Sequence, residues 1–264
     1  MLLDLIRIRS WKAYLGMSLF GYALSADTVD VRAVIFLVSM SLYLAFAFAI
    51  NNCYDTDTDV LSSKKNPVVS REVSQERARA ISYLFAASGF LTTLALPWTS
   101  SVLYALMLVL AYAYSAPPRL KALPPMDMIS HGLFFGAMIF LFGISVSGTF
   151  RLEHLEIALS IFFYSCLFEL RNHIEDFEND EKAGVKTSAV LLGERRDVAF
   201  SLLSMTHLAL LSQLMIPGSL YPMSGLILTS PEKLALKHFR IINAVTIAIY
   251  VLVLIQQKHF LYPL

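Results

Sequence analysis

Two copies of one acidic pattern are the residues of this sequence best placed to do chemistry. The pattern is N-x-x-x-D-x-x-x-D, and it comprises Asn51, Asp55 and Asp59 in one copy and Asn172, Asp176 and Asp180 in the other. A step of four residues advances only about 40° around an α-helix, so each copy forms a ladder about 12 Å long on one face. Carboxylate and amide oxygens suit Mg²⁺, which takes one or two carboxylates plus substrate phosphate oxygens. The four aspartates are therefore candidate catalytic residues, and all six residues are candidate Mg²⁺ ligands.

The alternative interpretation is that each acidic run is only a solvated helix end. Two matched copies argue against it, because each has an Asn four residues before its first Asp and each follows an apolar segment. From position 51 to position 172 the separation is 121 residues, close to half of the 264-residue chain. We therefore expect a single domain over residues 1–264, built from two pseudo-repeats at roughly 1–125 and 126–264.

Basic residues follow each acidic copy. They are Lys65 and Arg71 after the first copy, Lys182 and Lys186 after the second, and Arg119 and Lys121 in a third loop. Carboxylate-bound Mg²⁺ facing Lys or Arg suits a polyanionic phosphate, because metal and cations together stabilise the charge of a leaving group. The preference of cytoplasmic loops for positive charge is the alternative explanation for these cations.

The chain that must position these residues has the composition of a membrane protein. It is 56% hydrophobic and 16% charged, whereas soluble domains are about 45–50% apolar and about 25% charged. Its net charge of +1 disfavours nucleic acid as a partner, and two cysteines are too few for a disulfide-stapled module. Apolar runs bounded by charge or proline predict nine membrane spans, at 13–26, 32–50, 78–97, 101–114, 128–149, 154–171, 197–216, 218–230 and 241–257.

The basic residues also indicate an orientation. With nine spans, 18 of the 21 Lys and Arg residues fall on the side of the N-terminus, and Arg32, Arg151 and Lys258 fall on the other. The positive-inside rule then predicts that the N-terminus and the loops after the acidic copies are cytoplasmic, with the C-terminus across the cell membrane. The predicted fold class is an all-α polytopic membrane protein.

The motifs and their order resemble the UbiA superfamily of intramembrane prenyltransferases over nearly the whole chain. In that family, as here, two acidic copies end the second and sixth of nine spans. The loop from Tyr114 to Lys121, YSAPPRLK, is similar to the family's Y-S-x-P-P-x-R-L-K element. The run from Asp180 to Gly193 resembles the D-x-x-x-G-x-x-T…L-G stretch that follows the second copy.

Two stretches depart from the family pattern. Asn52 stands where the first copy commonly has Asp. In the following loop, Asn66 and Arg71 stand where the family's R-P-x-x-x-G has Arg and Gly. Basic contact with substrate in that loop is then expected from Lys65 or Arg71.

The resemblance implies a bundle with a central, lipid-accessible cavity beneath cytoplasmic loops. An isoprenyl diphosphate would bind there with its head group on Mg²⁺ and ionise at its C1–O bond. A lipophilic acceptor would attack the resulting cation, with release of pyrophosphate. Each acidic copy would hold one metal, the diphosphate ligands would be Arg119, Lys121, Lys182, Lys186, Lys65 and Arg71, and Tyr114 would line the site. The acceptor stays open between an aromatic quinone precursor and a lipid-type molecule.

A secondary transporter or ion pathway is the alternative from another functional class, because acidic residues in membrane helices also occur there. Transporters place such acids near the bilayer midplane, often beside broken helices. Here the acids lie at the ends of apolar segments with basic loops next to them. That position favours the enzyme.

Overall fold

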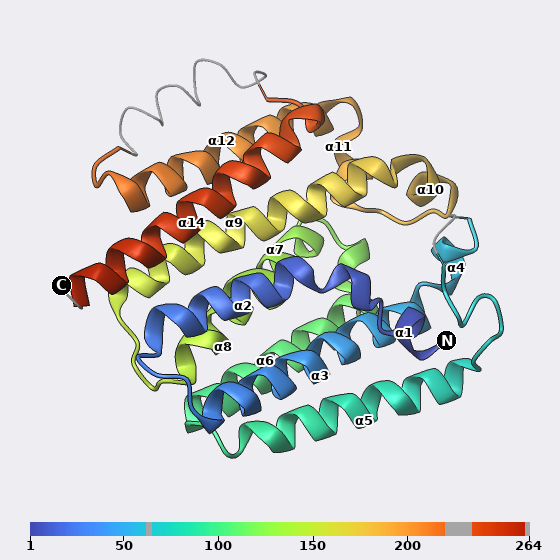
Figure 1. Ribbon diagram of the computed structural model, residues 1–264. Helices are drawn as coiled ribbons and strands as arrows, with labels where there is room; N and C mark the ends of the chain where they lie inside the picture. Colours follow the sequence, from blue (N-terminus) through green and yellow to red (C-terminus); the bar gives the residue numbers. More distant parts are fainter. Residues whose placement is uncertain (62–64, 220–233, 262–264) are drawn as a thin grey trace.

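The computed structural model describes residues 1–61, 65–219 and 234–261, and these form helices joined by short loops (Figure 1). The long helices are α2 (Lys12–Ser25), α3 (Val31–Tyr54), α5 (Gln75–Thr93), α6 (Trp98–Ser115), α9 (Leu152–Glu175), α12 (Arg196–Met215) and α14 (Phe239–Leu261). A further long helical stretch is formed by three consecutive segments, which are α7 (Met126–Gly132), a π-helical segment (Leu133–Ala137) and α8 (Met138–Ser145). The described part of the chain contains no strand, which confirms the all-α prediction.

Short helices cap the ends of the long ones. They are α1 (Leu2–Leu5), α4 (Thr56–Asp59), α10 (Phe177–Lys182), α11 (Ser188–Leu192) and the 3-10 segments Ile8–Ser10, Leu120–Ala122, Gly193–Arg195 and Leu236–His238. The N-terminal segment, α4 and α10 lie toward the same end of the bundle in Figure 1. The two acidic copies are therefore brought to one end of the molecule.

Five helical stretches have the length and composition of membrane spans. They are Val31–Tyr54, Trp98–Ser115, Met126–Ser145, Ser188–Met215 and Leu236–Lys258. Eight of the nine predicted spans overlap a long helix, whereas span 218–230 lies almost wholly outside the described residues. Helix α2 has only 14 residues, and α5 and α9 carry charged and polar side chains near their ends. The count of nine spans stays a prediction.

Each acidic ladder breaks at its middle aspartate, which corrects the expectation of one continuous helical face. Helix α3 ends before Asp55 (φ −96°, ψ 13°), and α9 ends before Asp176 (φ −93°, ψ 2°). An Asp side chain competes for backbone hydrogen bonds and so favours a helix end over a helix interior. The amide N–H of Asp59 still donates to the carbonyl of Asp55 (2.8 Å), and that of Asp180 to the carbonyl of Asp176 (3.0 Å). The four-residue spacing therefore survives the break.

Close backbone packing holds the helices around the site. Helix α3 packs on α5, α2 on α8, and α9 on α12. Where α2 meets α8, a Cβ atom on Gly143 would collide with the backbone carbonyl of Ser18, and one on Gly21 with that of Phe140. Small residues let membrane helices approach closely in this way. The Tyr43 hydroxyl also donates to the carbonyl of Phe134 (2.9 Å), which ties α3 to the π-helical segment.

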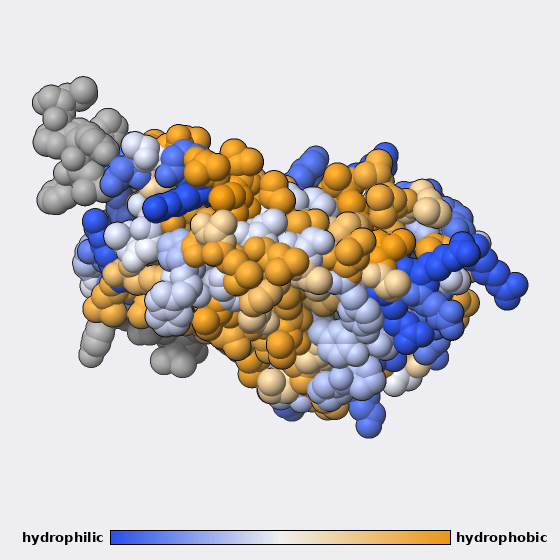
Figure 2. Space-filling model, turned by 90° about the horizontal axis from the view of Figure 1, so that it is seen from below, coloured by the Kyte–Doolittle hydropathy of each residue, from blue (hydrophilic) through white to orange (hydrophobic). Residues whose placement is uncertain are grey.

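The surface agrees with a membrane setting. In Figure 2 hydrophobic side chains cover the middle of the face that is shown, and the most hydrophilic ones gather toward its ends. Exposed apolar residues on the outer helices include Leu84, Leu91, Val109, Ile241 and Ile247. Exposed apolar surface of this extent marks contact with lipid or another protein.

Candidate active site

A cavity of about 460 Å³ lies between the ends of α3 and α9, beside α4 and α10. Eight of the residues predicted from sequence line it, namely Asn51, Asp55, Asp59, Tyr114, Lys121, Asn172, Asp176 and Asp180. The other five predicted residues, Lys65, Arg71, Arg119, Lys182 and Lys186, do not line it. Both acidic copies thus face one space, together with a tyrosine and a cation from the α6–α7 loop.

Cations already contact the carboxylates of the first ladder. Lys121 Nζ forms an ion pair with Asp55 Oδ1, and both side chains are buried. Arg7 Nη2 lies 3.0 Å from Asp59 Oδ2, and Arg7 also lines the cavity. Sequence reasoning missed Arg7, because it counted this residue only among the cations that set orientation. No local spacing links Arg7 to a ladder 52 residues away.

The departures from the family pattern have structural roles. Asn66 is buried, and its Nδ2 donates to Asp59 Oδ2 (2.8 Å) and to the carbonyl of Asn52 (2.9 Å). Asn52 Nδ2 donates to the carbonyl of Leu5 (2.7 Å), which holds the N-terminal segment that carries Arg7. The neutral side-chain amides of Asn66 and Asn52 therefore hold Asp59 and the N-terminal segment in place.

The remaining loop cations lie outside the cavity. Lys65 is exposed and pairs with Asp4 at 3.0 Å, and this hydrogen bond lowers the pKa of the Asp4 carboxyl. Arg71 is exposed, with a left-handed backbone (φ 59°). Lys182 is exposed and lies 3.7 Å from Glu178, and Lys186 is exposed as well. The structure does not bring these four residues to the cavity.

Arg119 is different, although it does not line the cavity. It is only partly exposed, and its backbone is left-handed (φ 61°). Its Nε and Nη2 atoms are buried without a hydrogen-bond partner. Buried donors of a guanidinium are costly to leave unpaired. The side chain is therefore suited to an anion that would bind beside the α6–α7 loop.

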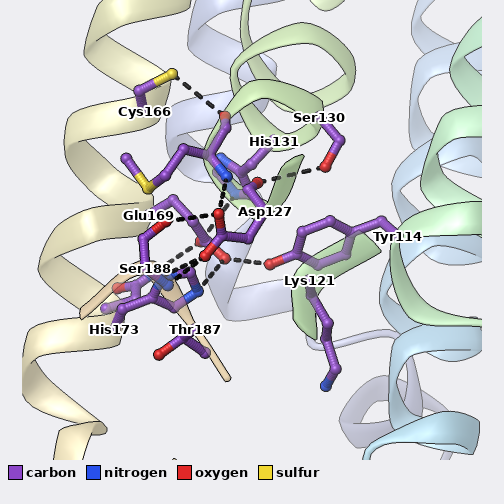
Figure 3. Close-up of polar contacts among 12 residues, drawn as sticks. Tyr114, Lys121, Asp127, Ser130, His131, Cys166, Glu169, His173, Thr187 and Ser188 are labelled. Carbon is purple, nitrogen blue, oxygen red and sulfur yellow. Dashed lines mark hydrogen bonds and ion pairs between the residues drawn. The ribbon is translucent and has the colours of Figure 1, made fainter. Parts of the chain in front are cut away.

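A buried polar cluster, which sequence reasoning missed, joins Tyr114, His131, Glu169 and His173 (Figure 3). Glu169 is 5% exposed and lines the cavity. It accepts hydrogen bonds from Tyr114 Oη and Asn172 Nδ2, and its oxygens lie 3.0 Å from His173 Nε2 and 3.3 Å from His131 Nε2. A signal existed in the sequence, because Glu169 lies three residues before Asn172 and therefore on the same helical face.

The cluster continues to the segment between α10 and α11, two residues of which line the cavity. Asp127 is fully buried and accepts hydrogen bonds from the amide N–H of Ser188 (2.5 Å) and from its Oγ (2.7 Å). His173 Nδ1 lies 3.5 Å from the same carboxylate. The neighbouring Thr187 and Val185 line the cavity. Asp127 thus anchors the segment after α10 at the wall of the cavity.

Aromatic side chains form the deeper wall. Tyr14 stacks on Phe135 with ring centroids 4.3 Å apart, and Phe48 and Phe134 lie 5.4 Å and 4.5 Å from the same ring. All four line the cavity, and the π-helical segment supplies two of them. π-Helical turns are often found at functional sites. The cavity therefore combines a charged end with an aromatic interior that can stabilise a cation through its ring faces.

The ladders supply suitable donors for Mg²⁺ without forming a compact metal cluster. In the described residues no group of three or more His, Cys, Asp and Glu side chains is arranged to hold a metal ion. Mg²⁺ does not need such a group, because it keeps waters and uses one or two carboxylates with substrate phosphates. Two opposed sets of carboxylate and amide oxygens around one cavity fit that coordination.

A family model, the UbiA prenyltransferase family, matches residues 14–255. The chain belongs to this family. The UbiA match extends over both acidic copies and the loop between them, and together with the apolar helices it identifies an integral membrane protein of a prenyltransferase family.

Two curated relatives of this chain are named for different activities. A lycopene elongase/hydratase of Haloarcula japonica is 30% identical over 206 residues, covering 73% of this chain and 67% of the relative. A digeranylgeranylglyceryl phosphate synthase of Ignicoccus hospitalis is 29% identical over 197 residues, covering 72% of this chain and 64% of the relative. The chain thus spans about two thirds of each relative's length.

A solved structure of a UbiA homologue from Archaeoglobus fulgidus, bound to DMAPP and Mg²⁺, has the same fold. It superimposes with a TM-score of 0.74 at 26% identity, and the match covers 96% of this chain and 98% of that protein. The match to the fold is therefore nearly complete.

Proposed function

We propose that this protein transfers a prenyl group from an isoprenyl diphosphate to a lipophilic acceptor in an Mg²⁺-dependent reaction that releases pyrophosphate. The observation that carries the proposal is the convergence of both acidic copies on one cavity with an aromatic interior. The Mg²⁺- and DMAPP-bound homologue supports it, because that protein shares the fold over nearly its full length. The proposal treats the chain as one domain of two pseudo-repeats with its active-site loops in the cytoplasm.

The ladders would bind the diphosphate through metal. Asn51, Asp55 and Asp59 would hold one Mg²⁺, and Asn172, Asp176 and Asp180 would hold the other. Bound Mg²⁺ would neutralise the charge that the leaving pyrophosphate acquires. The acids lie at helix ends beside cations, which supports an enzyme over a transporter, since transporter sites lie near the bilayer midplane.

The cations of this chain would complete the head-group site. Lys121 and Arg7 already contact the first ladder, so both are within reach of an anion bound there. Arg119 has unpaired buried donors for the same anion. The exposed Lys65, Arg71, Lys182 and Lys186 belong to the proposal only if the loops rearrange on binding. Fixed positive charge in a site with little water stabilises a leaving pyrophosphate more than solvent would.

The aromatic wall would accept the prenyl chain. When the C1–O bond breaks, its electron pair leaves with pyrophosphate and C1 becomes an allylic cation. Phe48, Phe134 and Phe135 would exclude water from that cation and face it with aromatic rings. The acceptor then forms the new bond to C1. One curated relative is named for the hydrocarbon lycopene and the other for a glyceryl phosphate lipid that it synthesises, so we expect a lipid-type acceptor.

The test is a prenyl-transfer assay on the full chain in lipid nanodiscs. Radiolabelled DMAPP or geranyl diphosphate is supplied with Mg²⁺ and, in separate reactions, lycopene or a geranylgeranylglyceryl phosphate. We expect pyrophosphate release and a labelled lipid product with one acceptor, and neither in Asp55→Ala. The exposed Asp57→Ala is the matched control and should retain activity. If the wild type binds no diphosphate and releases no pyrophosphate, the proposed function is wrong.

A further inference from the structure

We propose that Glu169 is a positioning residue that turns the side-chain amide of Asn172 so that its oxygen faces the metal. The inference rests on the proposed function, since it treats Asn172 as a ligand. Glu169 lies one helical turn before Asn172, and its Oε2 is 3.4 Å from Asn172 Nδ2. Both residues line the same cavity.

The chemistry of the carboxylate decides the orientation of the amide. An ionised carboxylate can only accept hydrogen bonds, whereas an Asn amide has one donating end and one accepting end. If the amide were reversed, its oxygen would lie against a carboxylate oxygen and both would lack a proton to share. Asn172 must therefore present Nδ2 to Glu169. Its Oδ1 is left on the other side as the atom that can bind Mg²⁺.

Glu169 is itself held rigidly, so it can impose this orientation (Figure 3). Tyr114 Oη and His173 Nε2 contact one of its oxygens, and His131 Nε2 contacts the other. His131 is fixed in turn by Ser165 Oγ, which lies 3.0 Å from its Nδ1. A buried carboxylate needs such partners, because an unpaired one is strongly destabilising. Outer contacts of this kind commonly orient the ligands of protein metal sites.

The first ladder has no carboxylate at the position that corresponds to Glu169. Three residues before Asn51 the chain has Phe48, where Glu169 precedes Asn172. Asn51 Nδ2 instead lies 3.4 Å from Ser115 Oγ. A hydroxyl can donate or accept, so Ser115 permits either orientation of the amide. We therefore expect Glu169 to act on the second metal alone.

The experiment measures Mn²⁺ binding by EPR in the full chain in nanodiscs. Glu169→Gln keeps the size of the side chain but can turn its own NH₂ toward Asn172, which releases the constraint. We expect it to weaken one Mn²⁺ site by about 10–100-fold, the usual effect of losing an outer contact. The matched control is Glu175→Gln, which removes the same charge from the same helix at an exposed residue that pairs with Arg171. It should bind Mn²⁺ as the wild type does.

A double-mutant cycle tests whether Glu169 acts through Asn172. In an Asn172→Ala background, Glu169→Gln should change Mn²⁺ affinity by less than about threefold, because the amide it orients is gone. Glu169→Asp keeps the charge but withdraws it by one methylene, and it should weaken the site as Glu169→Gln does. This variant decides the question if Glu169→Gln fails to fold, as judged by its unfolding midpoint.

Wild-type Mn²⁺ affinity in both Glu169 variants would overturn the inference and leave the proposed function intact. So would losses that add in full to those of Asn172→Ala, since Glu169 would then act by charge alone. A wild-type protein that binds no Mn²⁺ would instead refute the metal site, and with it this role of Glu169.

Discussion

Replacing Lys121 with methionine should destabilise the folded protein through Asp55. Lys121 and Asp55 are each 8% exposed, and they form an ion pair across 66 residues of sequence. Methionine keeps most of the length of lysine but removes its charge. The Asp55 carboxylate is then left buried without its cation, at the end of a helix and among other acids.

Burial determines the size of the effect. An exposed pair would contribute about 0–1 kcal/mol, whereas removing one partner of a buried pair costs about 3–5 kcal/mol. For a chain of this size each kcal/mol shifts the Tm by about 2–4 °C, so Lys121→Met should lower it by about 6–20 °C. Removing both charges with Asp55→Asn and Lys121→Met should restore most of that loss, because replacing a buried pair as a whole is nearly neutral.

The assay is thermal unfolding in nanodiscs, with and without Mg²⁺. A metal ion at the first ladder would supply positive charge next to Asp55, so Mg²⁺ should raise the Tm of Lys121→Met more than that of the wild type. Mg²⁺ should raise the Tm of the variant that carries both Asp55→Asn and Lys121→Met only slightly. A Tm of Lys121→Met within about 2 °C of the wild type would refute the reasoning, because the pair would then behave like an exposed one.

Three further predictions concern the ladder, the metal and the helix packing. Asp176→Ala should lower prenyl transfer by more than about 100-fold with little change in Tm; a near-normal rate would exclude Asp176 as a ligand. Removing divalent metal with EDTA should abolish pyrophosphate release, and added Mg²⁺ should restore it; activity that persists in EDTA would contradict the metal dependence. Gly143→Ala should destabilise the bundle by about 1–3 kcal/mol, because its Cβ would meet the Ser18 carbonyl; an unchanged Tm would argue against the close α2–α8 contact.

Sequence reasoning found those site residues whose position follows from local spacing. The ladder residues recur every four positions, so their shared face can be predicted without a structure. The break at Asp55 and Asp176 could not, because Asp disfavours a helix interior only weakly and the four-residue pattern allows a continuous helix. Tyr114 and Lys121 were found through a motif that spans the end of α6 and the loop after it, and both line the cavity.

Contacts between distant segments account for what was missed. Arg7 reaches Asp59 across 52 residues, and Tyr114 reaches Glu169 across 55. Nothing in the local pattern of either partner records such a pairing. Conversely, Lys182 and Lys186 follow the second ladder closely but are exposed. Both were predicted to bind the diphosphate because they follow the second copy closely. Cytoplasmic loops, however, are also rich in cations for reasons of membrane topology.

The two acidic copies match in backbone and differ in surroundings. Both ladders break at the middle aspartate with nearly the same φ and ψ, which supports our proposal of two pseudo-repeats. One turn deeper, Phe48 on α3 faces the cavity where α9 presents Glu169. In the proposed reaction, a diphosphate head group held by two metal ions would need similar ligands from both halves. One turn deeper the two positions have different contacts, because Phe48 belongs to the aromatic wall and Glu169 contacts Asn172, so the two halves would play different parts in the proposed reaction below the head group.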